Sequence, residues 1–511
     1  MAQEYVTDVT YVRGFEKSLS PTYLRLCAAV NGFDVPAKDT FDYCELGCAY
    51  GDTTIALAAS YPEARFVGID LNAEHVASAT ASAKGGAVDN VRFIEGDFET
   101  LDHGDFPEFD YITAHGVLSW IGPQKRKAVL DFLSSKLKPG GLAYVSYNTL
   151  PGWAAVEPLR QLILARAALS PGSTLEGAKL GLEFAKALNQ AGAYYFSGNP
   201  AAKAMLETME KAGLHYVVHE YLHAHWVPMY FAQLAAEMAA SDLYFVGQLP
   251  LYLNFRDVSI PSTLTSLFGQ ITERLAFEGL KDFALNTYFR SDVFVKGRPT
   301  HKGSATDAYF KATPFGMLED EGVFRGEAIL PNHTLRYTGP VYDALVPALR
   351  AGAQTIATLV ARPELATFGA RRIREAVTHL LLGECVSPMV EPTHAPAGEL
   401  RKLGVPSAYN RFVLQRGLES ETPTVLASRA AGNGVRLSKI DAAALTCFLE
   451  VDRAHQTEWL RRFCRDAVSY LVVGDRVITD PAEREANVLA EVEKFRATRL
   501  PKLVELGIVK I

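Results

Sequence analysis

Cysteine is scarce in this sequence, with six residues among 511, at positions 27, 44, 48, 385, 447 and 464. A disulfide-stabilised scaffold needs a much higher density of cysteine, so that class of protein is excluded. Cys44 and Cys48 are four residues apart, but no second pair with the spacing of a zinc site accompanies them. We therefore expect reduced thiols in a cytoplasmic protein, and we predict no metal site.

Long apolar runs and an excess of positive charge are also missing. No uninterrupted stretch of about 20 apolar residues occurs, as a membrane-spanning helix would require, and the first residues lack the apolar core of a secretory signal. Lysine and arginine total 51 against 58 acidic residues, a net charge of −7, and the longest basic run is Lys125-Arg126-Lys127. We therefore expect neither nucleic acid nor a membrane as a partner.

The first 150 residues alternate short apolar runs with helical patterns. Strands are predicted at 41–46, 65–70, 91–94, 109–114 and 142–148, and helices at 52–60, 73–84 and 123–137. Strands that alternate with helices over short loops indicate an α/β protein with a doubly wound, Rossmann-like parallel sheet. Such sheets bind their ligands at the carboxyl ends of the strands.

The loop after the first predicted strand distinguishes between two kinds of ligand. A dinucleotide fingerprint requires glycine at positions 47, 49 and 52, whereas this sequence has Ala49 and Asp52. An acid at the start of the next helix repels a pyrophosphate, which prefers the positive end of a helix dipole. The sequence therefore disfavours a nicotinamide dinucleotide.

The spacing of Glu45, Gly47, Ala49 and Gly51 instead resembles the first motif of class I S-adenosylmethionine-dependent methyltransferases. The resemblance implies that the two glycines let the backbone pass close to the methionine part of the cofactor, with Glu45 near its ammonium group. Asp70, which is 19 positions after Gly51, matches the acid that accepts the ribose hydroxyls. The cofactor-binding residues so implied are Glu45, Gly47, Cys48, Ala49, Gly51, Asp70, Leu71, Asp97, Phe98 and His115.

Longer strings narrow the resemblance. CELGCAYGDT, FVGIDLN, FDYITAHGVLSWI and LKPGGLAYVSYNTLPGW are similar to bacterial methyltransferases that carry a methyltransferase regulatory domain, of which protein lysine methyltransferases are the best known. The resemblance implies methyl transfer from S-adenosylmethionine to a nucleophile, with a protein lysine side chain as the first hypothesis. A small-molecule N- or O-methyltransferase is the second, and a catalytically weak cofactor-binding regulatory protein is the third.

Methyl transfer is a direct displacement, so the protein must align the nucleophile and exclude water. Tyr147 and Asn148, in the loop after the fifth strand, are predicted to orient an amine and are our catalytic candidates. His115 either accepts a proton or positions the cofactor. Trp120 and Trp153 are predicted to wall the acceptor site.

The N-terminal segment is expected to fold over the cofactor. Ser20-Pro21 has the pattern of a helix start. Before it, Tyr11 is predicted to contact the substrate, and Arg13 either pairs with the methionine carboxylate of the cofactor or lies on a solvated arm.

One motif suggests a different chemistry. His219-Glu220-Tyr221-Leu222-His223 matches the H-E-x-x-H pattern of zinc proteases, which requires a helix that presents both histidines. The flanking residues favour a strand and a loop, so we interpret the match as accidental.

The remaining chain is predicted to form accessory units. We expect a cofactor-binding domain from 1–152 and 218–255, a helical insertion at 153–217, a regulatory-type accessory domain at 256–385 with a helix over 262–289, a linker at 386–407, and a mainly helical α+β domain at 408–511. Helical insertions of this kind cap the cleft or support a homodimer in the lysine methyltransferases that the sequence resembles. The partner is then a protein substrate or a small-molecule acceptor.

Overall fold

A computed structural model of the chain describes residues 13–511 except 36, 39, 102–103, 105, 171, 222–224, 299–301, 319–325, 397–402, 420–422 and 475. For residues 215, 216 and 219 it describes the backbone only. In this part of the chain, no helix combines the length and the apolar character that a membrane span requires.

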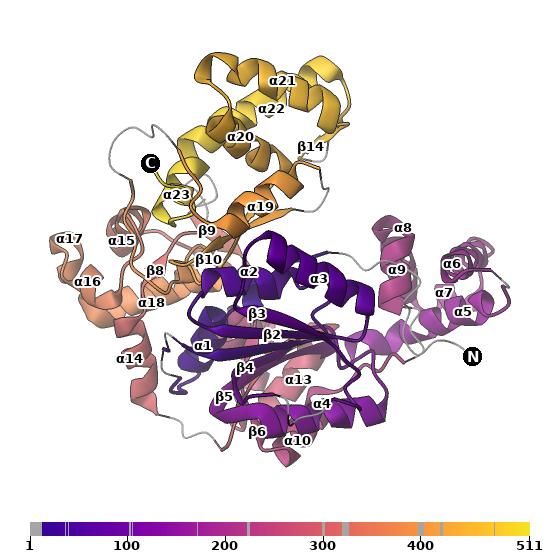
Figure 1. The fold of residues 1–511 in the computed structure, drawn as a ribbon. Helices are drawn as coiled ribbons and strands as arrows, with labels where there is room; N and C mark the ends of the chain where they lie inside the picture. Colours follow the sequence, from indigo (N-terminus) through magenta and orange to yellow (C-terminus); the bar gives the residue numbers. More distant parts are fainter. Residues whose placement is uncertain are drawn as a thin grey trace.

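A seven-stranded sheet forms the centre of the molecule, in the order β3-β2-β1-β4-β5-β7-β6 (Figure 1). The strands are β1 (Asp42–Leu46), β2 (Arg65–Asp70), β3 (Val91–Glu95), β4 (Phe109–Ala114), β5 (Leu137–Asn148), β6 (Leu243–Leu249) and β7 (Phe289–Lys296). Strands β1 to β5 are parallel, and β7 is antiparallel to both β5 and β6. The predicted doubly wound α/β sheet is confirmed.

Helices cover both faces of the sheet. One face packs against α1 (Pro21–Val30), α2 (Asp52–Ser60) and α3 (Ala73–Gly85), and the other against α4 (Pro123–Lys136) and α10 (Phe231–Ala240). Because successive side chains of a strand point to opposite faces, Tyr144 of β5 joins the first core and Tyr147 the second. Because of this alternation, Tyr144 contacts His115 and Tyr147 does not.

Local signals place the element boundaries well. Ser20 caps α1 by accepting a hydrogen bond from the Tyr23 N–H, and Pro21 occupies the first helical position, as predicted. Strands β2 and β4 and helix α2 have the predicted bounds, and the other predicted elements up to residue 148 differ from the structure mainly at their ends.

The prediction fails for the segment after residue 255. In place of one helix over 262–289, the chain forms η5 (Ser262–Leu264), α12 (Thr265–Phe268) and α13 (Arg274–Leu285), and α13 ends where Asn286 adopts a left-handed conformation. Residues 289–296 then enter the central sheet as β7, between β5 and β6. The sheet therefore extends beyond the domain boundary that we expected near residue 255.

The insertion after β5 is helical, as predicted. It comprises α5 (Glu157–Ala167), α6 (Thr174–Gln190), α7 (Tyr194–Ser197), α8 (Pro200–Ala212) and α9 (Leu214–Tyr221), which share a core with Trp153 and Trp226. Helix α9 contains the first three residues of the H-E-x-x-H pattern, so the expected strand and loop are wrong at 214–221.

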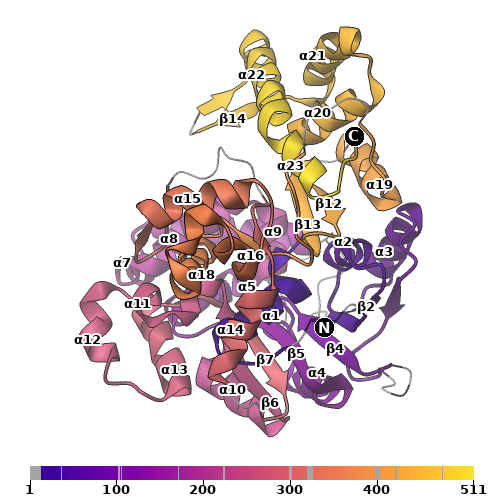
Figure 2. The ribbon, with the colours of Figure 1, turned by 90° about the vertical axis from the view of Figure 1, so that its left-hand side faces the viewer.

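Two further units complete the chain (Figures 1 and 2). The first contains α14 (Gly303–Ala312), α15 (Pro340–Arg350), α16 (Ile356–Val360), α17 (Pro363–Ala366), α18 (Gly369–Leu382) and the short strands β8 (Phe315–Gly316), β9 (Glu327–Ile329), β10 (Thr334–Arg336) and β11 (Ser387–Pro388). Residues 386–389 are buried and β11 pairs with β8, so this part of the expected linker is integral to the fold.

The second unit, residues 408–511, is here called the C-terminal module. It contains α19 (Ala408–Gly417), α20 (Lys439–Glu450), α21 (Gln456–Ala467), α22 (Pro481–Lys494) and α23 (Leu500–Glu505), with the hairpins β12 (Thr424–Ser428)–β13 (Asn433–Leu437) and β14 (Leu471–Val473)–β15 (Arg476–Ile478). The β12–β13 hairpin packs against α2, one of the helices that cover the central sheet (Figure 2).

Candidate active site

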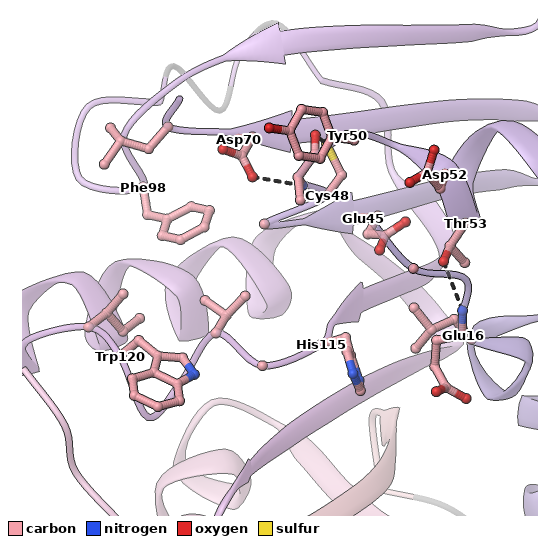
Figure 3. Close-up of a pocket in the computed structure, with 18 of the residues that line it drawn as sticks. Glu16, Glu45, Cys48, Tyr50, Asp52, Thr53, Asp70, Phe98, His115 and Trp120 are labelled. Carbon is pink, nitrogen blue, oxygen red and sulfur yellow. Dashed lines mark hydrogen bonds between the residues drawn. The ribbon is translucent and has the colours of Figure 1, made fainter. Parts of the chain in front are cut away.

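A cavity of about 400 Å³ lies at the carboxyl ends of β1, β2 and β4 (Figure 3). This is the edge at which a doubly wound sheet binds its ligand. Its lining includes Arg13, Glu16, Glu45, Gly47, Cys48, Ala49, Asp70, Leu71, Asp97, Phe98, His115, Trp120, Lys125, Glu220 and Arg436. Most of the predicted cofactor-binding residues are thus brought together.

The turn after β1 depends on two glycines with positive φ. A Cβ on Gly47 would lie 2.6 Å from Val117, and one on Gly51 would lie 2.6 Å from the Phe93 ring. Gly47 lines the cavity. We therefore still propose that the backbone at Gly47 passes close to the methionine part of the cofactor. Gly51 packs against β3 and does not line the cavity, which corrects its predicted position beside the ligand.

Glu45 ends β1 with a buried carboxylate. It accepts a hydrogen bond from the Thr54 hydroxyl of α2. Burial raises the pKa of Glu45 to about 7, although the Thr54 hydrogen bond acts in the opposite direction. A buried carboxyl group of this kind gains from a cation placed beside it.

Asp70 ends β2 and is nearly buried, with 9% of its surface exposed. Its Oδ2 accepts the Ala49 N–H at 2.8 Å (Figure 3), and its Oδ1 accepts the Asn72 N–H at 2.9 Å and lies 3.2 Å from His75 Nδ1. A carboxylate offers about four acceptor positions, so about one remains for a ligand hydroxyl. Leu71 beside it is 44% exposed and presents an apolar surface to the cavity.

Asp97 and Phe98 follow β3 on the same side of the cavity. Lys125 Nζ donates to Asp97 Oδ2 at 2.7 Å, and the Glu99 N–H donates to Oδ1 at 3.1 Å. Partial burial raises the pKa of Asp97, but these two hydrogen bonds outweigh burial and hold it below its usual value. The Phe98 ring faces the cavity opposite Asp70 (Figure 3).

His115 directly follows β4 and lies on the side of the cavity that is nearer Glu16 than Phe98 (Figure 3). Its Nδ1 lies 3.1 Å from both the Tyr144 hydroxyl and Ser146 Oγ. Burial lowers the pKa of His115, so the ring is neutral at neutral pH. Because Tyr144 donates its proton to Ser291, the phenol oxygen can accept from Nδ1, which favours a tautomer with a free lone pair on Nε2.

Several predicted residues do not reach the cavity. Tyr147 is fully buried on the opposite face of the sheet, where its hydroxyl donates to Asp292 Oδ2 at 2.6 Å, and Asn148 is buried outside the cavity lining. Trp153 packs edge-on against Trp226 in the core of the insertion and donates to the Tyr288 carbonyl, so it is a packing residue. Trp120 lines this cavity, and its predicted role at the acceptor site stays a prediction. Tyr11, predicted to contact the substrate, lies outside the described residues.

Asp52 of α2 and four charged residues from other segments also line the cavity, and the sequence did not predict any of them there. Glu16 comes from the N-terminal segment, Lys125 from α4, Glu220 from α9 and Arg436 from β13. In the sequence, Lys125 stands out only as part of a short basic run, and Glu220 only as part of the zinc pattern. No local motif marks Glu16 or Arg436, because long-range packing alone brings them to the cavity.

The zinc pattern itself gains no support from the described residues, among which no three potential ligands of His, Cys, Asp or Glu type cluster. The side chains of His219 and His223 lie outside those residues, so the pattern stays untested. Glu220, its central acid, faces the cavity, and burial raises its pKa to about 7.

The donor set fits S-adenosylmethionine. One end of the cavity combines Asp70 for a ribose hydroxyl with the apolar faces of Leu71 and Phe98 for a base. The other end holds the buried Glu45, whose carboxyl group suits a cationic amino group. A side chain at Gly47 would clash with Val117, so the turn requires a glycine whose bare backbone faces the cavity.

Comparison with known proteins points to the same cofactor. Residues 44–141 match the model of a methyltransferase domain, and residues 213–296 match that of a predicted methyltransferase regulatory domain. The chain is an S-adenosylmethionine-dependent methyltransferase with a class I fold. The chain thus combines a region that matches a methyltransferase domain with a region that matches a predicted methyltransferase regulatory domain.

Individual relatives differ in how much of the chain they cover. An uncharacterized protein of Synechocystis sp. is 29% identical over 99% of both chains. The trans-aconitate 2-methyltransferase of Deinococcus radiodurans is 31% identical over 22% of this chain and 39% of its own. The structure of PKMT2 from Rickettsia typhi in complex with AdoHcy superposes with a TM-score of 0.71 at 19% identity, over 97% of this chain and 99% of that one.

Cofactor affinity is expected to increase with pH through the titration of Glu45. Burial raises the pKa of Glu45 to about 7, so in the free protein it is largely protonated below that pH. An ammonium group beside it favours the charged carboxylate, so binding releases a proton. Affinity for S-adenosylhomocysteine should then rise by up to about tenfold per pH unit below the pKa and level off above it. Titration calorimetry at several pH values measures this slope.

A matched pair of variants tests whether Glu45 causes the dependence of affinity on pH. Glu45→Gln should flatten it, whereas Glu220→Gln should leave it in place, although burial raises the pKa of Glu220 to about 7 as well. If Glu45→Gln shows the same dependence of affinity on pH as the wild type, Glu45 does not bind the ammonium group.

Proposed function

We propose that this methyltransferase methylates an amine, with a protein lysine side chain as the acceptor. The supporting observation is a second cavity of about 220 Å³, which shares Glu16 and His115 with the cofactor cavity. Its wall combines the rings of Tyr23, Tyr144 and Phe289 with the carboxylate of Glu384. Aromatic faces and carboxylates are the groups that attract an ammonium ion.

A lysine of the chain itself illustrates this chemistry. Lys17 lines the second cavity, pairs with Glu384 at 2.5 Å and lies 6.0 Å above the Tyr23 ring. Both charged side chains are about half exposed, at 43% and 49%, so this part of the cavity reaches the surface. An acceptor lysine on another protein could enter there and extend toward His115.

The residues between the two cavities would prepare the acceptor. When bound, S-adenosylmethionine supplies an electrophilic methyl carbon, and only an unprotonated amine can attack it. Neutral His115, with its Nε2 lone pair, is placed to accept a hydrogen bond or a proton from the amine. Trp120 and Phe98 line the other end of the cofactor cavity, where their rings would limit the access of water.

Labelled S-adenosylmethionine incubated with the enzyme and a cell lysate tests the acceptor class. We expect the label in protease-sensitive, high-molecular-weight material that yields methyl-lysine on hydrolysis. Label confined to small molecules would support a metabolite methyltransferase, and no transfer would support a cofactor-binding regulatory protein; either result overturns the proposal.

The second cavity has its own test. Glu384→Gln should raise the KM for the acceptor at least tenfold while leaving the affinity for S-adenosylhomocysteine unchanged. Glu364→Gln, which alters an exposed glutamate paired with Arg362 on a distant helix, is the control. Equal kinetics in the two variants would contradict the placement of the acceptor.

The other unit boundaries, a homodimer supported by the helical insertion, and a cytoplasmic location remain proposals from the sequence. Sedimentation of the purified chain would measure the oligomeric state directly.

A further inference from the structure

The C-terminal module reaches the cofactor cavity through its β12–β13 hairpin. Asn433 Nδ2 donates to both the Lys17 carbonyl and Ser20 Oγ at 3.0 Å, and the Ser60 hydroxyl donates to the Asn433 carbonyl at 3.2 Å. Gly434 leaves space for the Phe15 ring, which a Cβ would approach to 2.6 Å. The hairpin is thus fixed both to the N-terminal segment and to α2.

Arg436, two residues further along β13, extends from this hairpin into the cavity lining. Its guanidinium donates to the Phe15 carbonyl and lies 5.9 Å above the Phe15 ring. The adjacent Glu16 N–H donates to Thr53 Oγ1 at 3.0 Å. Figure 3 shows Glu16 and Thr53 beside Glu45, at the end of the cavity away from Phe98 and Trp120. Arg436 therefore lies at the end assigned to the amino-acid part of the cofactor.

Among the described residues, three lysine or arginine side chains line this cavity. Two of them are paired with carboxylates. Arg13 pairs with Asp52 at 2.7 Å and also donates to Ser78 Oγ, which disfavours its predicted role on the cofactor carboxylate. Lys125 pairs with Asp97 at 2.7 Å, at the opposite end. Arg436 has no carboxylate within ion-pair distance among the residues that the structure describes.

We propose that Arg436 binds the methionine carboxylate of S-adenosylmethionine, so that the C-terminal module completes the cofactor site. The cofactor brings one carboxylate into the cavity, and a guanidinium binds a carboxylate with two parallel charge-assisted hydrogen bonds. Glu45 and Arg436 then recognise the two charges of the amino-acid group separately. This inference rests on the cofactor placement proposed above, and it assigns a binding role to a unit that carries no cofactor motif of its own.

Two ligands that differ only in the amino-acid part test the inference by calorimetry on the full-length protein. S-Adenosylhomocysteine carries the carboxylate, and 5′-methylthioadenosine lacks the whole amino-acid group. Arg436→Met should weaken binding of the first at least tenfold and change binding of the second less than twofold. Arg436→Lys, which keeps the charge but loses the fork of donors, should give an intermediate loss.

The control is Arg429→Met, which alters an exposed arginine just before the same hairpin turn and outside the cavity lining. It should bind both ligands like the wild type. Unchanged binding of S-adenosylhomocysteine to Arg436→Met, or equal losses for both ligands, would overturn the role of Arg436. Failure of the wild type to bind either ligand would instead refute the cofactor placement itself, and the inference with it.

Discussion

Replacing Asp70 by alanine is expected to weaken the binding of S-adenosylhomocysteine at least tenfold. The carboxylate lines the cavity where we propose that the ribose binds, and it also fixes the surrounding turn by accepting the Ala49 and Asn72 N–H groups. A hydrogen bond to a charged group contributes about 1.5–3 kcal/mol, and about 1.4 kcal/mol corresponds to a tenfold change in affinity. Loss of a ligand contact and of the preorganised turn act in the same direction.

Calorimetry with purified variants measures this effect. Asp70→Asn keeps the shape and removes the charge, so it should show a smaller loss than alanine. Asp89→Ala, at an exposed position before β3, is the control and should bind like the wild type. A folded Asp70→Ala protein with unchanged affinity would refute the assignment of the ribose site.

Replacing Arg290 by alanine is expected to lower the free energy of unfolding by about 3–5 kcal/mol, because buried carboxylates lose their partner. Arg290 on β7 is fully buried and pairs with Glu278 at 3.1 Å, Asp282 at 2.9 Å and Asp292 at 2.9 Å. Burial lowers the pKa of Arg290, but its acidic neighbours outweigh burial and hold it well above its usual value. Urea unfolding followed by tryptophan fluorescence measures this loss as a shift of the transition midpoint to a lower urea concentration.

Tyr147→Phe provides the comparison in the same cluster. It removes one hydrogen bond to Asp292, so we expect a smaller loss of about 1–3 kcal/mol and unchanged cofactor affinity. An unfolding transition of Arg290→Ala that coincides with that of the wild type would contradict the structural role of the cluster. Methyl transfer abolished in a stable Tyr147→Phe protein would restore the catalytic role that the sequence suggested.

The local parts of the candidate site were predictable. The spacing from Glu45 to Gly51 and the acid at Asp70 are short-range patterns, because one turn and two strand ends determine where those backbones lie. The structure places Glu45, Gly47, Asp70, Asp97 and His115 around one cavity, as the motifs indicated. Capping residues such as Ser20 act within a single turn of helix and were equally readable.

Side-chain direction at the end of β5 was not predictable in the same way. Tyr144 and Tyr147 differ by an odd number of residues, so they must point to opposite faces of the sheet. Which face approaches His115 depends on the helices that pack above and below. Tyr144 contacts His115, whereas Tyr147 contacts the buried charges of β7.

The order of the sheet shows the same limit. Residues 289–296 were expected in an accessory domain, yet they pair with β5 from Leu142 to Asn148. A strand pattern indicates that a segment is extended, but it does not indicate which strand it pairs with. Pairing depends on which strand edges are available in the folded chain.

The sequence by itself determined the class of cofactor, the alternation of strands and helices in the first 150 residues, and the turn at Gly47, since all of these depend on residues close together in the chain. Only the tertiary structure decided that Gly51 packs on β3, that Trp153 belongs to a core, and that Arg436 lines a cavity at the ends of strands more than 300 residues earlier in the chain. Hydrogen-bonding and steric rules act over a few residues and leave a motif, whereas contacts between distant segments depend on packing that no local pattern records.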